Sequence, residues 1–355
     1  ERREGRIYLN NSPLYQKLIL DQGYWPDSNI TPPSDEAIKL DLQYTLDFGY
    51  NGARKHQKLE DPRYYYWADK MGVLVWGELP SPYDYTEETV RNLADTMMEF
   101  IERDFNHPSV IMWSLGNEAG DGPNFTKAYA MVKEMDESRP VHYERTFDYK
   151  DGKNSPNTDI ACPMYFDYDD CERYAMSEPE KPLIQCEYAH AMGNAMGNFK
   201  EYWDVTYAHS SLIGGCVWDW MDQAFWAGTG RIDPATGREE RYLAYGGDFY
   251  DHPHNGPICQ NGIIGPLAEV TPKLVEVGHV HRNLVVERGT GFVLWNRFAF
   301  TYADEFDGSW RLLEDGAEVG LVIMESVNGD SLEFVSDEAI TNAVFDAFME
   351  SFGEE

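Results

Sequence analysis

The chain has 355 residues, 42% of them hydrophobic, and can therefore bury a large core. That length has room for one barrel of about 250 residues and roughly a hundred residues more. The net charge of −33 argues against nucleic acid and anionic membranes as partners, because phosphate groups bind clustered lysine and arginine. No apolar stretch approaches the roughly 18 residues of a membrane span, so we expect none.

The cysteines and the first residues bear on the cellular context. The five cysteines are odd in number and include no CxxC pair, which argues against a disulfide framework and a structural zinc site. The chain begins Glu1-Arg-Arg-Glu-Gly, without an initiator methionine or a signal peptide, so we expect it to be part of something longer. We expect a cytoplasmic location, although a removed export signal would leave no trace.

Segments typical of buried strands alternate with helix-like segments through most of the chain. The expected strands are Tyr15–Leu20, Asn51–His56, Val73–Glu78, Val110–Asn117, Val141–Arg145, Asp159–Tyr165, Pro182–Tyr188 and Leu212–Trp220. The expected helices include one that begins after Ser34 as N-cap and the segments Thr86–Phe105, Asn124–Glu137 and Asn198–Tyr207. Eight strands are the number that a closed barrel requires, so we predict an α/β fold with a (β/α)8 TIM barrel over residues 1–275.

The pattern changes after about Glu276. Residues 283–303 are rich in Val, Phe, Leu and Trp with partial alternation, and Gly-Thr-Gly and Asp-Gly turns follow, which is typical of antiparallel β-structure. We therefore predict a β-rich segment over residues 276–355 that resembles the start of a β-sandwich. It ends in an acidic tail, residues 325–355, in which residues 337–352 have helical spacing and for which the sequence suggests no function.

Two of the apolar strand segments end on a carboxylate. Residues 109–118 read Ser-Val-Ile-Met-Trp-Ser-Leu-Gly-Asn-Glu, and residues 182–187 read Pro-Leu-Ile-Gln-Cys-Glu. Barrel enzymes carry their chemistry at the carboxyl ends of strands. Glycosidic bond cleavage needs two carboxyl groups, about 5–5.5 Å apart in retaining enzymes and roughly 6.5–9.5 Å apart in inverting ones. We predict that Glu118 and Glu187 form such a pair, with Tyr188 and His190 as donors that keep Glu187 ionised.

These blocks carry a family resemblance. Residues 103–120, from Arg-Asp-Phe-Asn-His-Pro to Gly-Asn-Glu-Ala-Gly, resemble the acid/base block of glycoside hydrolase family 2. Residues 182–194 resemble the nucleophile block of its β-galactosidases, and the match continues at residues 214–223 and 245–249. The resemblance covers roughly residues 5 to 315, the central barrel and the start of the following sandwich; we expect the family's preceding domains to be absent.

The resemblance implies roles for particular residues. Glu118 matches the acid/base and Glu187 the nucleophile of a retaining double displacement. Asn117 matches a residue that contacts the 2-hydroxyl of the sugar. Tyr165 matches a tyrosine that hydrogen-bonds the nucleophile, and the residues matching the galactose pocket are His190 and Trp218.

Two loops depart from the family pattern. The family often carries Arg-x-x-His-Tyr-Pro after the second strand, but residues 54–62 read Arg-Lys-His-Gln-Lys-Leu-Glu-Asp-Pro, which displaces His56 by one position. Residues 20–26, Leu-Asp-Gln-Gly-Tyr-Trp-Pro, replace a first loop that bears a histidine in the family. We expect at least one of Asp21, Trp25, His56 and Lys58 to contact the sugar, and His56 is the candidate that we include in the site.

The resemblance also implies that Mg²⁺ or Na⁺ could bind near the site. We expect no organic cofactor. The family's galactosidases hold Mg²⁺ through the acid/base glutamate and a Glu-x-His after the third strand, which residues 76–85 lack. Glu78 and Asp84 are the oxygen ligands that remain there, and a polar site without a metal is the simpler interpretation. Asn261 matches a sodium-site residue whose other side-chain partner belongs to an absent domain.

Three functions remain open. The first is a retaining β-galactosidase, which Trp218 and Trp220 favour. The second is a catalytic-domain fragment that is inactive or weakly active without its missing domains. The third is a hydrolase of another β-glycoside, such as a glucuronide or a mannoside. The expected partner is a small-molecule or oligosaccharide β-glycoside; a homo-oligomer or association with the missing domains is also open.

Overall fold

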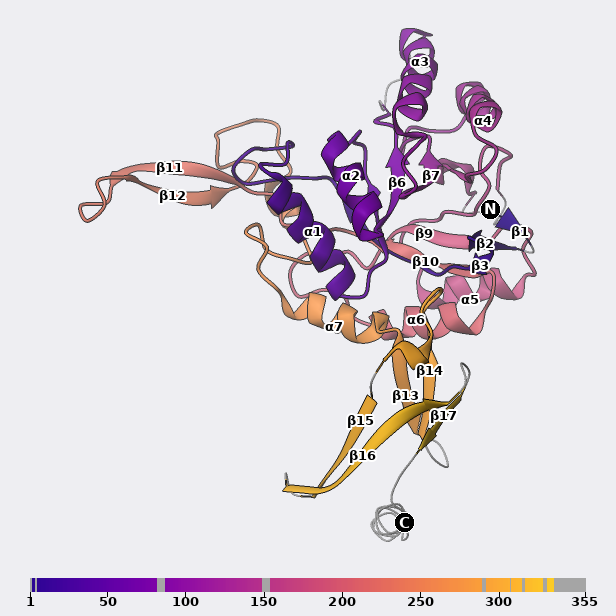
Figure 1. Ribbon diagram of the computed structural model, residues 1–355. Helices are drawn as coiled ribbons and strands as arrows, with labels where there is room; N and C mark the ends of the chain where they lie inside the picture. The colour runs from indigo at the N-terminus through magenta and orange to yellow at the C-terminus, as the bar shows by residue number, and fades with distance from the viewer. Residues whose placement is uncertain are drawn as a thin grey trace. The chain divides into compact units, whose positions relative to one another are not determined.

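The computed structural model describes residues 2–3, 5–81, 87–148, 154–288, 292–306, 308–314, 317–327 and 331–334 (Figure 1). The chain divides into two compact units, residues 1–282 and residues 283–355. The boundary expected between residues 275 and 276 falls within α7 (Pro272–His281). Among the described helices, none combines the length and the hydropathy needed to cross a membrane.

A parallel sheet of seven strands organises the first unit. In chain order the strands are β4 (Gln16–Asp21), β5 (Gly52–Lys55), β6 (Leu74–Glu78), β7 (Val110–Ser114), β8 (Val141–His142), β9 (Leu183–Tyr188) and β10 (Leu212–Val217). Their order in the sheet is β8-β7-β6-β5-β4-β10-β9, and every neighbouring pair is parallel. Every residue of β4, β5 and β9 is buried, as expected for strands covered on both faces.

The segment 159–165 closes the sheet between β8 and β9. The Asp159 N–H donates to Val141 O at 2.8 Å, and Ala161 and Met164 form parallel bridges with Leu183 and Glu187. Pro163 has no N–H to donate, so the ladder is interrupted and the regular strand predicted here does not form. The TIM-barrel fold is confirmed, with this irregular segment in the sixth strand position.

The fifth strand is also shorter than predicted. Only Val141 and His142 pair as β8, and residues Glu144–Thr146 turn into a 3₁₀-helix, η1. The Thr146 hydroxyl donates to Tyr143 O at 2.6 Å within this turn. Local side-chain bonding of this kind competes with continued strand pairing.

Helices follow the strands along the chain. They are α1 (Asp35–Asp47), α2 (Pro62–Met71), α3 (Glu87–Asp104), α4 (Pro123–Met135), α5 (Tyr168–Met176), α6 (Phe199–Ala208) and α7. The predicted N-cap is confirmed, because the Ser34 side chain accepts the Ala37 N–H at 3.2 Å. Gly72 ends α2 in the left-handed conformation that glycine adopts without strain.

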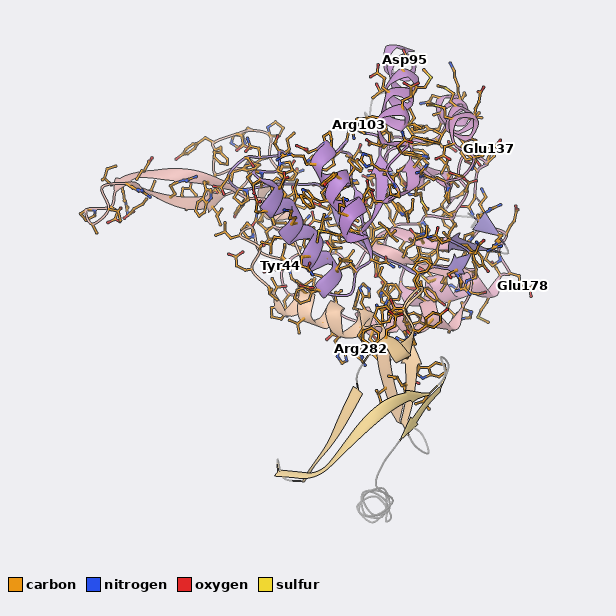
Figure 2. All side chains as sticks on the ribbon, in the orientation of Figure 1. Tyr44, Asp95, Arg103, Glu137, Glu178 and Arg282 are labelled. Atoms are coloured by element: carbon orange, nitrogen blue, oxygen red, sulfur yellow. The ribbon has the colours of Figure 1, made fainter. Side chains whose placement is uncertain are left out.

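The core of this unit lies on both sides of the barrel wall. The space that the strands enclose is filled by buried side chains that include Leu18, Leu20, Trp76, Met112 and Ile184. Two larger groups pack between strands and helices, one around Trp113 and Phe100, the other around Trp203 and Val217. Side chains therefore fill the volume between the ribbons in Figure 2.

Short strands complete the first unit. β1 (Arg2–Arg3), β2 (Arg6–Leu9) and β3 (Ser12–Pro13) form a small antiparallel sheet. β11 (Phe225–Ile232) and β12 (Glu239–Ala244) form a hairpin that projects from the barrel as an arm (Figure 1). A 3₁₀-helix, η2 (Gly256–Cys259), follows this arm.

The second unit is antiparallel in its described part, as predicted from residue 283 onward. β13 (Leu284–Arg288) pairs with β14 (Phe292–Asn296), and η3 (Ala303–Glu305) follows. β15 (Gly308–Glu314), β16 (Ala317–Val327) and β17 (Ser331–Phe334) form a second antiparallel sheet. The acidic tail therefore begins within β16 and includes β17; the helical spacing over residues 337–352 lies outside the described residues.

Gly214 is required where β10 pairs with β4, opposite Gln16. Its φ is +124°, and a Cβ atom there would lie 2.1 Å from Gln16 O. We expect Gly214→Ala to lower the free energy of unfolding by about 3 kcal/mol or more, measured by chemical denaturation. Gly237→Ala is the matched control, because φ is +69° but the space around it is open. Equal losses in the two variants would contradict the steric argument.

Candidate active site

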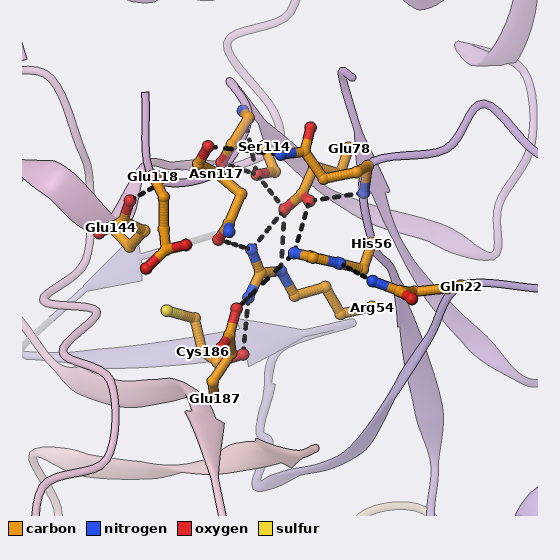
Figure 3. A network of polar contacts seen from close by, with 12 residues as sticks. Gln22, Arg54, His56, Glu78, Ser114, Asn117, Glu118, Glu144, Cys186 and Glu187 are labelled. Carbon is orange, nitrogen blue, oxygen red and sulfur yellow. Dashed lines mark hydrogen bonds and ion pairs between the residues drawn. The ribbon is translucent and has the colours of Figure 1, made fainter. Parts of the chain in front are cut away.

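The predicted glutamates lie at the carboxyl ends of the barrel strands. Glu187 is the fifth residue of β9, and Glu118 follows β7 after a short turn. Their side chains point into the same space (Figure 3), and the negative charge of Glu118 helps to raise the pKa of Glu187. The two carboxyl groups differ sharply in exposure, because the Glu187 side chain is 6% exposed and that of Glu118 is 40% exposed.

Arg54 on β5 lies at the centre of the polar network (Figure 3) and is fully buried. Its Nε donates to Glu78 Oε2 at 2.8 Å, Nη1 to Cys186 O at 2.7 Å, and Nη2 to Asn117 Oδ1 at 2.8 Å. Nη1 also lies 3.5 Å from Glu187 Oε1. A buried guanidinium must be paired and hydrogen-bonded, and these four partners satisfy that requirement.

Both carboxylate oxygens of Glu78 on β6 accept hydrogen bonds from the protein. Its Oε2 accepts from Arg54 and from Ser114 Oγ at 2.8 Å, and its Oε1 accepts the Gln57 N–H at 2.8 Å. These residues do not fit a Mg²⁺ site, because a guanidinium occupies the side of Glu78 that a cation would need. Asp84, the other candidate ligand, lies outside the described residues. Within the described ranges, no group of three His, Cys, Asp or Glu side chains could hold a metal ion.

The environment of Glu187 combines burial with a few donors. Tyr165 Oη donates to Glu187 Oε2 at 3.1 Å, and His56 Nε2 lies 3.7 Å from Oε1. Burial raises the pKa of Glu187 to about 8, against the lowering effects of Arg54 and Tyr165. The prediction that Tyr188 keeps Glu187 ionised is wrong: alternate strand residues face opposite ways, and Tyr188 Oη accepts from Trp203 Nε1 at 3.1 Å.

Glu118 is held by the residues that follow β8. Its backbone has φ of +49°, which is unusual for a non-glycine residue, and its N–H donates to Glu144 Oε1 at 2.5 Å. Arg145 Nη2 lies 3.4 Å from Glu118 Oε1, and Tyr143 Oη accepts the Ala119 N–H at 3.2 Å. Burial raises the pKa of Glu144 to about 7. These contacts fix the backbone of Glu118 while its carboxyl group stays accessible.

Asn117 is bound on both its backbone and its side chain. Its N–H donates to Ser81 Oγ at 3.0 Å, while its Oδ1 accepts from Arg54. The side-chain oxygen is thus engaged by protein, which leaves the amide N–H₂ as the group able to bind a sugar hydroxyl.

The remaining predicted residues form an aromatic wall. The His56 ring meets Trp218 edge-on at 5.1 Å, and the His190 ring lies parallel to Trp218 at 6.2 Å. Tyr165 follows, with its ring centroid 6.3 Å from that of His190. His190 and Trp218 are partly buried, whereas His56 is 6% exposed. Apolar rings with polar edges suit the faces and hydroxyls of a sugar.

Sequence reasoning missed Arg54 and Glu144 as parts of the site. A sequence signal existed for the first, because an arginine inside a short strand of a parallel sheet is buried only when it is paired. Glu144 gave no such signal, since a glutamate near a strand end is ordinarily exposed.

A closed parallel barrel that carries carboxylates at the carboxyl ends of its strands is the arrangement typical of TIM-barrel enzymes. Residues 4–286 match the family model described as "Glycosyl hydrolases family 2, TIM barrel domain". The chain belongs to family 2 of the glycosyl hydrolases, and the resemblance noted in the sequence is confirmed.

Curated relatives cover most of the chain. A β-galactosidase of Photobacterium profundum is 32% identical over 348 residues, which are 90% of this chain and 32% of that protein. A β-galactosidase of Priestia megaterium is 41% identical over 233 residues, 64% of this chain and 22% of that protein. The chain thus spans about a third of the length of the first of these relatives and less of the second.

Solved structures share the fold. A β-galacturonidase of Eisenbergiella tayi, bound to galacturonate, superposes with a TM-score of 0.61 at 18% identity, covering 79% of this chain and 53% of that one. A β-glucuronidase of Ruminococcus gnavus in complex with D-glucuronic acid gives 0.61 at 18% identity, covering 79% and 51%. At this identity the likeness shows the fold alone.

The raised pKa of Glu187 predicts a pH-dependent stability. The folded chain keeps the Glu187 proton from the ordinary pKa of 4.5 up to about 8, where the unfolded chain has released it, so stability falls as pH rises through that window. Glu187→Gln removes this penalty. Relative to the wild type, we expect the unfolding free energy of this variant to rise by about 5 kcal/mol at most between these two pH limits. Denaturation at stepped pH measures the gain.

The control for this experiment is Glu240→Gln, the same chemical change at an exposed position of β12. It reports the baseline effect of the substitution on the pH series. If the difference in unfolding free energy between Glu187→Gln and the wild type stayed constant from pH 4 to pH 9, the raised pKa of Glu187 would be contradicted.

Proposed function

We propose that the chain is the catalytic barrel of a retaining β-glycoside hydrolase, with terminal β-galactosides as its substrates and a covalent glycosyl-enzyme as its intermediate. The observation that carries the proposal is the unequal pair of glutamates. Glu187 is buried against Arg54 and Tyr165, whereas Glu118 is accessible and held only through its backbone and Arg145. Two carboxyl groups in unlike environments are suited to different roles.

In the first step, ionised Glu187 attacks the anomeric carbon while Glu118 gives its proton to the leaving oxygen. In the second step, Glu118 accepts a proton from water, which then displaces Glu187 and releases the sugar. The accessible position of Glu118 suits it to the side where the leaving group departs and water enters. The family resemblance assigns the same order of roles.

Arg54 and Tyr165 are positioned to support the charge on Glu187. Each faces one oxygen of the carboxylate, Arg54 at Oε1 and Tyr165 at Oε2. Both lower the pKa of Glu187 against the effect of burial, and so enlarge its ionised fraction near neutral pH. Neither residue needs to transfer a proton in this scheme.

The choice of galactose rests on the relatives and on the wall of the site. The relatives above are named β-galactosidases, and Trp218 and His190 stand where the family resemblance places the galactose pocket. The wall itself consists of aromatic side chains, and none of them is a lysine or an arginine that could pair with a uronic acid carboxylate. Arg145, the cation beside Glu118, is engaged by Glu118 and Glu144.

A substrate panel tests the activity and the sugar. We expect the chain to hydrolyse nitrophenyl β-galactoside faster than the β-glucuronide or the β-mannoside, and EDTA to leave the rate unchanged. Glu187→Gln and Glu118→Gln should each lower kcat by about 10³-fold or more, because each removes a group that acts in both steps of the reaction. Glu137→Gln, an exposed residue of the same type labelled in Figure 2, is the control.

Two results would overturn this part of the proposal. Absence of turnover on every glycoside at high enzyme concentration would favour the alternative that these residues are inactive without further domains. Faster turnover of the glucuronide or the mannoside would leave hydrolysis in place but reject galactose as the preferred sugar.

Azide rescue tests the retaining assignment. Glu118→Ala still allows the glycosyl-enzyme to form from a substrate with an activated leaving group, and azide then attacks without needing a general base. We expect the product to be the β-glycosyl azide, identified by NMR of its anomeric proton. Formation of the α-glycosyl azide would reject Glu118 as the acid/base of a retaining enzyme.

Tyr165→Phe tests the support of the nucleophile. Removing a donor to the charged form raises the pKa of Glu187, so a higher pH is needed to ionise it. We expect kcat/KM to fall by about ten- to a hundredfold and the acidic limb of its pH profile to move to higher pH. Tyr168→Phe, on α5 and away from this hydrogen bond, is the control. A fall in rate with an unmoved acidic limb would indicate a purely structural role for Tyr165.

A further inference from the structure

A chain of side-chain hydrogen bonds leads to His56 from residues 219 and 223 through Gln22, which lies in a loop that departs from the family pattern. Gln223 Nε2 donates to Asp219 Oδ2 at 3.1 Å and to Gln22 Oε1 at 2.6 Å. Gln22 Nε2 lies 2.7 Å from His56 Nδ1, as Figure 3 also shows. An amide nitrogen can only donate, so Nδ1 of His56 must accept and carries no proton. The proton of the neutral ring is therefore on Nε2.

His56 Nε2 is directed into the space beside the nucleophile (Figure 3). It lies 3.7 Å from Glu187 Oε1 and 3.9 Å from Glu78 Oε1, both too far for a hydrogen bond. Within the described part of the chain, this buried atom has no hydrogen-bond partner. The structure thus contains a buried donor beside Glu187 whose hydrogen bond is not made by the protein.

The other groups around the ring favour its neutral form. Burial first, and then the charge of Arg54, lower the pKa of His56 well below its ordinary value, while the nearby Asn117 opposes them. Trp218 covers the ring edge-on. A neutral His56 ring can donate one hydrogen bond from Nε2. A charged ring would also be an acid that could protonate Glu187, which attacks the sugar in its ionised form.

We propose that Gln22, held in place by Gln223, fixes His56 as the Nε2–H tautomer, and that this N–H donates to a hydroxyl of the bound sugar next to Glu187. The inference rests on the proposed function. A hydroxyl oxygen placed to one side of the 3.7 Å gap can accept from Nε2 and donate its own proton to Glu187 Oε1. Gln22 is then a positioning residue, and His56 selects sugars that carry a hydroxyl at that place.

The tautomer is measured directly by NMR of the protein labelled with ¹⁵N at its histidine rings, with His56→Asn used to assign the signal. We expect the neutral Nε2–H form in the wild type near neutral pH. Gln22→Glu should move the proton to Nδ1, because a carboxylate accepts where the amide donated. Gln43→Glu, the same change on the exposed face of α1, should leave the His56 signal as it is.

Kinetics test whether the tautomer matters. We expect Gln22→Glu to lower kcat/KM by about ten- to a hundredfold, the effect of losing one hydrogen bond to a buried polar group, with Gln43→Glu unchanged. Gln22→Met is the second variant, for use if Gln22→Glu does not fold. It removes the amide donor without adding a charge, so both neutral tautomers of the His56 ring should be populated.

The outcomes separate this inference from the proposed function. A wild-type ring that is charged or protonated on Nδ1, a tautomer that ignores the Gln22 variants, or a shifted tautomer with unchanged kinetics would each overturn it. A galactose-configured iminosugar that inhibits turnover should shift the Nε2–H signal, and inhibition without a shift would reject the hydroxyl contact. Absence of all turnover would reject the proposed function, while the NMR of the wild type and the Gln22 variants would still decide the tautomer.

Discussion

The buried guanidinium of Arg54 is the constraint on which the rest of the site depends. Its nitrogens reach β6 through Glu78, β9 through Cys186 and Glu187, and the loop after β7 through Asn117. Removing it would leave Glu78 charged and buried without its partner, which typically costs about 3–5 kcal/mol. One side chain therefore sets the spacing between four neighbouring parts of the barrel, and the candidate nucleophile is placed by the same contacts that stabilise the fold.

The same contacts explain why the two glutamates differ. Glu187 projects from a strand that is buried throughout, so its carboxylate is desolvated and depends on Arg54 and Tyr165. Glu118 lies one turn beyond its strand. Its N–H donates to Glu144, while its carboxyl group is 40% exposed and lies 3.4 Å from Arg145. Position relative to the strand end, rather than residue type, is what gives one glutamate a buried and the other an accessible environment.

The sequence predicted the strands, most helix positions and the two glutamates, because apolar runs and their ends are local signals. It failed where structure depends on contacts distant in sequence. The strand expected at 141–145 turns into η1 after two residues, and Pro163 interrupts the ladder in the sixth position. The role of Arg54 could not be read from residues 52–55, since its partners come from three other segments, although a charge in such a strand was itself a warning.

Adjacent residues of β5 serve two separate networks, which bears on how specificity can vary within one catalytic arrangement. Arg54 faces Glu78 and Glu187, whereas Lys55 pairs on the other side with Asp21 and, at 2.7 Å, with Glu60. Lys58 Nζ, which lies 3.0 Å from Glu60, also donates to Gly23 O at 2.9 Å, so the two loops that depart from the family pattern are joined to each other. The loops that carry Gln22 and His56 can therefore change together, while the contacts around Glu187 stay as they are.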